Sequence, residues 1–148
     1  MHSESIHSES IYDTGPASID WALLSVRIAA GVIFAAHGSQ KLFGAFGGPG
    51  LGTLVEMMGT VGYFVAIGEF FGGLGLLVGF LSRFSAAALI VIMIGAIVKV
   101  HGQHGFFLGA QPGFEFNFAL IGLLTAVLLA GPGRLSLARL ISLPTGFR

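Results

Sequence analysis

Cysteine is absent from this 148-residue chain, and charged residues make up only 9% of it. Without cysteine the chain can form no disulfide, no thiolate metal site and no thiol redox centre, so a redox role would need an electron carrier from elsewhere. So few charges, against a globular norm of roughly 25%, cannot cover a water-soluble surface. The formal net charge of zero also removes the basic surface that nucleic-acid binding needs, so no nucleic-acid partner is expected.

Hydrophobic residues make up 54% of the chain and gather in four windows, at about 19–37, 61–81, 84–98 and 115–130. A helix of about 20 mostly apolar residues can cross the hydrocarbon core of a bilayer. We therefore expect an all-α fold, a polytopic membrane four-helix bundle formed by one domain at 18–140. A disordered polar tail is expected at 1–17, where His-Ser-Glu-Ser-Ile repeats, and a C-terminal tail at 141–148.

Lysines and arginines in the loops predict the orientation of the bundle. With four crossings, one side carries four of these residues and the opposite side carries two: Arg83, Arg134, Arg139 and Arg148 against Lys41 and Lys99. This asymmetry places both termini in the cytoplasm. The predicted location is a bacterial inner membrane, with the chain crossing it several times.

Glycines recur along the second window at steps that keep them on one face of a helix: Gly68, Gly72, Gly75 and Gly79. Stripes of small residues let membrane helices approach each other closely. We expect this face to pack against a neighbouring helix rather than to form a binding site.

Two charges lie inside the predicted helices, Arg27 in the first window and Glu69 in the second. An ionised side chain at the centre of a membrane helix costs about 2.5–3.5 kcal/mol, so each needs a partner. We expect Arg27 and Glu69 to pair across the first two helices. The pair either locks the register of the bundle or lines a polar cavity, in which Glu69 exchanges a proton or Arg27 holds an anionic or carbonyl oxygen.

Further polar residues gather where the predicted helices end on the opposite side from the termini. The predicted ligand pocket consists of Arg27, His37, Lys41 and Glu69, and its outer rim of Gln40, Lys99, His101, His104, Glu115 and Asn117. The histidines have three alternative roles: capping helix ends at the headgroup level, holding a metal ion with Glu115, or ligating a haem. No strict ligand spacing is present, so no metal site is predicted.

Three segments of the sequence resemble the DoxX family of small four-helix bacterial membrane proteins. They are "LSVRIAAGVIFAAHGSQKLFGAFGG", "GEFFGGLGLLVGFLSRFSAAAL" and "GPGRLSLARL", in order over about residues 19–140. Arg27, His37, Lys41 and Glu69 match the family pattern, whereas Ala138 stands where the family would lead us to expect Asp. The resemblance implies redox work at the membrane, since relatives are linked with thiosulfate:quinone oxidoreduction, with quinone or catechol detoxification, and with oxidative and thiol stress.

The leading functional hypothesis is a redox-associated subunit that binds a quinone or another small redox molecule in an intra-bundle polar pocket. Phenylalanines could flank the ring: Phe34, Phe43 and Phe46. As an enzyme the chain is at most a subunit of a quinone-linked membrane oxidoreductase, without turnover alone; a haem is the less favoured cofactor. The alternatives are a non-catalytic scaffold for redox or detoxification enzymes and a small proton or anion transporter. The lipid bilayer is an expected partner, and a homo-oligomer stays open.

Overall fold

The structure is a computed structural model that describes residues 17–141. Four long helices run up and down in order: α1 (Ser18–Phe43), α3 (Val61–Val78), α4 (Ser82–Ala96) and α5 (Glu115–Ala130). Two short helices, α2 (Gly50–Met58) and α6 (Leu137–Leu140), complete them, and a π-helical turn at Ile97–His101 extends α4. Over the described range the fold is all-helical, with one isolated β-bridge and no strand.

The four predicted windows correspond to the four long helices. The first helix is longer than predicted, because it continues through His37 and Lys41 to Phe43 and ends at Gly44, whose φ of 71° is left-handed. The short helix α2 was not predicted. The predicted tails lie outside the described residues, apart from Ala17 and Ile141.

Within residues 17–141, three helical stretches are long and apolar enough to cross a membrane: Ser18–Phe43, Val61–Val78 and Ser82–His104. The fourth, Glu115–Ala130, is apolar but shorter. Its crossing, and the cytoplasmic side of the termini, therefore stay predictions.

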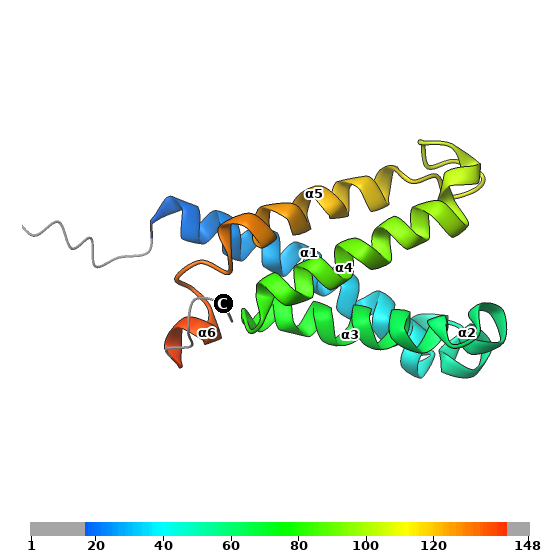
Figure 1. Ribbon diagram of the computed structural model, residues 1–148, viewed down its shortest axis with the longest axis horizontal. Coiled ribbons are helices and arrows are strands. Elements are labelled where there is room, and N and C mark those ends of the chain that lie inside the picture. Colours follow the sequence, from blue (N-terminus) through cyan, green and yellow to red (C-terminus); the bar gives the residue numbers. More distant parts are fainter. Residues whose placement is uncertain (1–16, 142–148) are drawn as a thin grey trace, which may run out of the picture.

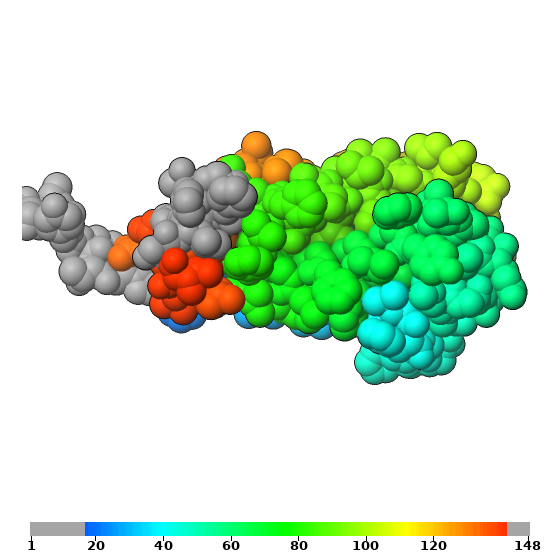
Figure 2. Space-filling model, turned by 60° about the horizontal axis from the view of Figure 1, so that its bottom comes forward, coloured from blue at the N-terminus to red at the C-terminus, as the bar shows by residue number. Residues whose placement is uncertain are grey.

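The bundle has two distinct ends (Figure 1). At one end, called here the α6 end, lie the start of α1, the α3–α4 turn and α6. At the other, the α2 end, lie α2 and the loop that connects α4 to α5. In the space-filling view the cyan and teal residues around α2 form a bulky end of the molecule (Figure 2).

Glycines bring α3 close to two neighbours. A methyl group at Gly38 of α1 would lie 2.5 Å from Cα of Phe70, so the two backbones nearly touch. On another face of α3 three glycines of the predicted stripe pack against α4, where methyl groups at Gly68, Gly72 and Gly75 would meet side chains of that helix. The packing role predicted for these three glycines is confirmed. The fourth, Gly79, ends α3 and lies instead against Arg27 and Ser136.

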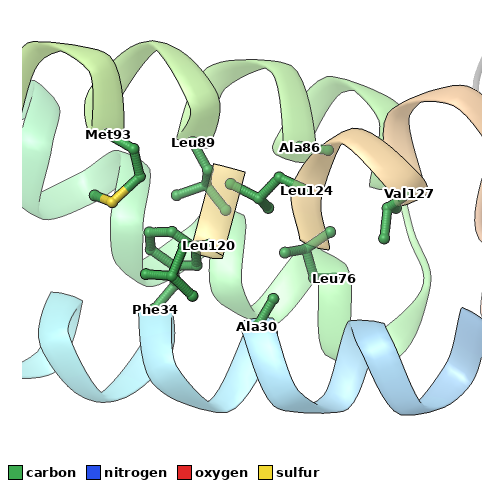
Figure 3. Close-up of a cluster of buried hydrophobic side chains, with 9 residues drawn as sticks. All are labelled: Ala30, Phe34, Leu76, Ala86, Leu89, Met93, Leu120, Leu124 and Val127. Atoms are coloured by element: carbon green, nitrogen blue, oxygen red, sulfur yellow. The ribbon is translucent and has the colours of Figure 1, made fainter. Parts of the chain in front are cut away.

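A buried apolar cluster fills the middle of the bundle (Figure 3). All four long helices contribute to it: Ala30, Phe34, Leu76, Ala86, Leu89, Met93, Leu120, Leu124 and Val127. Phe34, Met93 and Leu120 lie together at one end of the cluster (Figure 3). The helices are therefore tightly packed on the α6 side of these three residues.

Candidate functional site

A cavity of about 680 Å³ lies at the α2 end of the bundle, above this cluster. Phe34, Met93 and Leu120 belong both to the buried cluster and to the lining of the cavity, so they form its floor. The walls come from α1, α3, α4 with its π-helical turn, and α5, and most of them are apolar. The volume is in the range of small-molecule sites, about 300–1,000 Å³.

One ion pair lies on the cavity wall, between the Lys41 ammonium and the Glu69 carboxylate. Glu69 is buried, whereas the Lys41 side chain keeps 23% of its surface exposed. Lys41 reaches the cavity because α1 stays helical up to Phe43. Phe34 and Lys41 are two helical turns apart and therefore share the inward face.

The predicted pair between Arg27 and Glu69 is wrong. Arg27 is buried at the α6 end, where Nη1 donates to the Pro132 carbonyl at 2.7 Å and Nη2 donates to the Leu135 carbonyl at 2.7 Å. Glu69 takes Lys41 as its partner instead.

The helix register explains this difference. Because Gly38 lies against Phe70, Glu69 is level with about Ser39 of α1. At about 1.5 Å per residue, Arg27 is then on the order of 18 Å away along the axis. Arg27 accordingly does not line the cavity.

Six of the ten predicted site residues do line the cavity: His37, Lys41, Glu69, Lys99, His101 and Asn117. Gln40 instead packs against the loop after α1, where a methyl group at Gly48 would lie 2.5 Å from Gln40 Cβ. Glu115 accepts a hydrogen bond from the Leu108 backbone at 2.7 Å and so holds the α4–α5 loop. His104 is outside the lining, and its buried Nδ1 has no partner among the described residues.

Two polar side chains on the wall retain hydrogen-bonding capacity. The Asn117 amide donates to the sulfur of Met93 at 3.4 Å, and a thioether is a weak acceptor. The His37 ring lies at a tilt against Phe116, with 6.4 Å between centroids. Asn117 and His37 can therefore serve a ligand in the cavity without losing a strong internal bond.

The π-helical turn contributes three consecutive residues to the lining: Lys99, Val100 and His101. Short π-helical segments inside helices are frequent at functional sites. His101 is fixed there because its Nδ1 lies 3.0 Å from the Pro112 carbonyl oxygen. No group of three or more potential metal ligands comes together within residues 17–141.

Of the three phenylalanines proposed to flank a ring, only Phe34 lines the cavity. Phe43 packs edge-on against Phe70, with ring centroids 5.2 Å apart, and Phe46 is exposed beyond the helix end. Asp20, at the start of α1, has a structural role that its position in the sequence indicates only in part. Its buried carboxylate accepts hydrogen bonds from the backbone nitrogens of Ala17 and Arg134 at 3.0 and 2.6 Å.

Asp20 and Arg27 together fix the loop that follows α5. In sequence, an acidic residue in the first turn of a helix is a familiar stabilising feature of that helix, which explains part of the role of Asp20. Nothing in the sequence pattern indicated that the carboxylate also binds a loop more than 100 residues away. Both residues therefore serve the α6 end and not the cavity.

An all-helical bundle with three candidate membrane spans and a largely apolar cavity defines the chain as a polytopic membrane protein. The chain belongs to the DoxX family, whose sequence model matches residues 22–102. The match begins within α1, extends through α4 and ends within the α4–α5 connection, so it contains the Lys41–Glu69 pair. This confirms the resemblance seen in the sequence.

The chain is similar to a protein of Mycobacterium tuberculosis described as "Uncharacterized membrane protein Rv3486". The two are 30% identical over 152 aligned residues, which cover 89% of this chain and 86% of the relative. A second sequence model, described as a PGF-CTERM motif, matches residues 111–131, which include α5. No solved structure matches the chain significantly.

Proposed function

We propose that this protein is a redox-associated membrane subunit that binds a quinone, or a similar small redox molecule, in the cavity at the α2 end. The observation that carries the proposal is the Lys41–Glu69 pair on the wall of an otherwise largely apolar cavity. A flat apolar ring with polar oxygens matches such a site, since the walls receive the ring and a few polar groups fix its orientation. The location proposed for the protein is a bacterial inner membrane.

The polar residues have distinct roles in this proposal. The Lys41 ammonium donates a hydrogen bond to a carbonyl oxygen of the ring and stabilises negative charge that develops there on reduction. Glu69 holds the ammonium in place and provides a carboxylate that can accept or return a proton. Asn117, whose amide donates to the sulfur of Met93, is placed to contact a second polar atom of the ring.

The electron donor comes from a partner, because the chain has no cysteine with which to supply thiol chemistry. A redox or detoxification enzyme at the membrane is the proposed partner class. The transport alternative requires a path from the cavity past Arg27, but the floor residues separate the two in the described part of the chain. The scaffold alternative becomes the conclusion if the cavity binds no ligand.

The test is purification in mild detergent, followed by solvent extraction and mass spectrometry of the bound small molecules. We expect an isoprenoid quinone to co-purify with the protein, and the Glu69→Gln variant to retain at most about a tenth of it. Glu56→Gln is the matched control, because Glu56 is an exposed glutamate of α2 outside the cavity lining. Absence of any quinone, or equal retention by both variants, would overturn the proposal.

A further inference from the structure

The seam between α3 and α4 is closed at three positions, and beyond them a neighbouring face of α4 is open. Methyl groups at Gly75, Gly72 and Gly68 would lie 2.6, 3.1 and 2.7 Å from the nearest side-chain atoms of α4. Three residues beyond Ile92, the α4 residue that meets Gly68, lies Gly95, where a methyl group would meet nothing within 4 Å. Figure 1 shows the same divergence, since α3 and α4 meet at the α6 end and separate toward the α2 end.

The gap that results, called here the α3–α4 opening, is framed by Val61 and Phe64 on α3 and by Val91 and Gly95 on α4. All four residues line the cavity and are nevertheless exposed, Phe64 and Val91 each to 70%. Both helices belong to stretches that qualify as membrane spans. The opening therefore faces the hydrocarbon of the bilayer.

On the other sides of the cavity the apolar lining residues are less exposed than Phe64 and Val91. On the α1–α5 side, the rings of His37 and Phe116 lie 6.4 Å apart between centroids, and Phe116 is 41% exposed. Toward the α2 end, Leu108 and Pro112 of the α4–α5 loop line the cavity, and Leu108 is 57% exposed. Two hydrogen bonds fix this loop, one from the Leu108 backbone to Glu115 and one between the Pro112 carbonyl and His101.

We infer that the ligand enters the cavity from within the bilayer through the α3–α4 opening, and that it is an amphiphile with a long apolar chain. Its polar head reaches the Lys41–Glu69 pair, and its chain stays in the opening and continues into the lipid. The apolar frame of the opening suits such a chain, because the chain can stay in the lipid while the head occupies the cavity and no polar group has to enter the hydrocarbon. This inference rests on the proposed function and specifies the class of ligand and its route.

Gly95→Phe tests the inference directly. The open space around Gly95 admits the new ring without a clash, and the ring then fills the opening. Gly122→Phe is the matched control, because Gly122 is an exposed glycine of α5 with nothing within 4 Å and lies outside the cavity lining. Both changes replace a helical glycine and alter helix propensity equally.

The measurement compares two radiolabelled probes on the full chain in nanodiscs: a benzoquinone with a long isoprenoid chain, and the same ring without the chain. We expect Gly95→Phe to weaken binding of the long-chain probe at least about tenfold and binding of the short probe less than about twofold. Gly122→Phe should leave both unchanged.

Each other outcome has a definite meaning. If Gly95→Phe leaves long-chain binding unchanged, the route and the chain requirement are both wrong. If it weakens both probes equally, the chain requirement is wrong. In either case the cavity remains a quinone site. If the wild type binds neither probe, the proposed function fails and the inference fails with it. Circular dichroism and a size-exclusion profile confirm that the variants are folded.

Discussion

Removing either member of the Lys41–Glu69 ion pair should destabilise the protein. Substitutions of Arg27 and Glu69, in contrast, should have independent effects on the free energy of unfolding. The Lys41→Met change leaves a buried carboxylate without its ionic partner. Breaking a fully buried pair in this way costs about 3–5 kcal/mol. Because Lys41 keeps 23% of its side-chain surface exposed, we expect a smaller loss, about 2–4 kcal/mol in the free energy of unfolding.

The reverse change has a smaller expected effect. In Glu69→Gln the buried group becomes neutral, and the partly exposed ammonium of Lys41 can turn toward polar surroundings. We expect a loss of about 1–2 kcal/mol. The double variant should lose less than the sum of the two single variants, by a coupling free energy of about 1–3 kcal/mol.

A second double-mutant cycle serves as the control. Arg27 and Glu69 lie at different levels of the bundle, with different partners. Groups more than about 10 Å apart without shared partners behave additively within about 0.5 kcal/mol. The cycle made from Arg27→Met and Glu69→Gln should therefore show coupling within that margin.

The assay is unfolding of the purified protein in mixed micelles, driven by increasing mole fractions of dodecyl sulfate and followed by circular dichroism. All variants of both cycles are measured under identical conditions, so that the differences in free energy are comparable. The reasoning is refuted if Lys41 and Glu69 show no coupling beyond about 0.5 kcal/mol, or if Arg27 and Glu69 couple as strongly as Lys41 and Glu69 do.

Two further predictions concern the helix seam and the loop after α5. Gly38→Ala should lower the free energy of unfolding by at least about 1–3 kcal/mol, because its methyl group meets the backbone of α3, whereas Gly52→Ala, with nothing within 4 Å, should be neutral or stabilising. Equal effects of the two in micelle unfolding would contradict the close α1–α3 contact. Arg27→Met should speed tryptic cleavage after Arg134 at least about tenfold, because two hydrogen bonds that hold the loop are lost. Ser25→Ala, on the exposed face of α1, is the control and should leave the cleavage rate unchanged. An unchanged rate in Arg27→Met would show that Arg27 does not anchor the loop.

The sequence located the helices well because their physical requirement is local. A run of apolar residues is soluble in the bilayer core only as a helix, since every backbone amide must be paired within the segment. Turn chemistry at the ends of these runs then divides them. The same local rule misplaced the end of α1. The apolar run stops at His37, but polar residues can continue a helix, and α1 ends only at Gly44.

Local pattern also showed which residues need partners, but not which partners they take. Arg27 and Glu69 were both identified as intramembrane charges that cannot stand alone. Their pairing depends on the register of α1 against α3, which is fixed by the contact between Gly38 and Phe70. The spacing of residues within one helix does not indicate its axial register against another helix.

The sequence by itself determined a cysteine-free, charge-poor chain of apolar helices with a small-residue seam, because composition and period are properties of each segment alone. Only the tertiary structure decided that Lys41 meets Glu69, that Arg27 holds a loop at the far end, and that a cavity exists. The cavity forms where α3 and α4 diverge beyond their last tight contact at Gly68. The divergence depends on the angle between two helix axes, and the sequence of either helix alone does not indicate that angle.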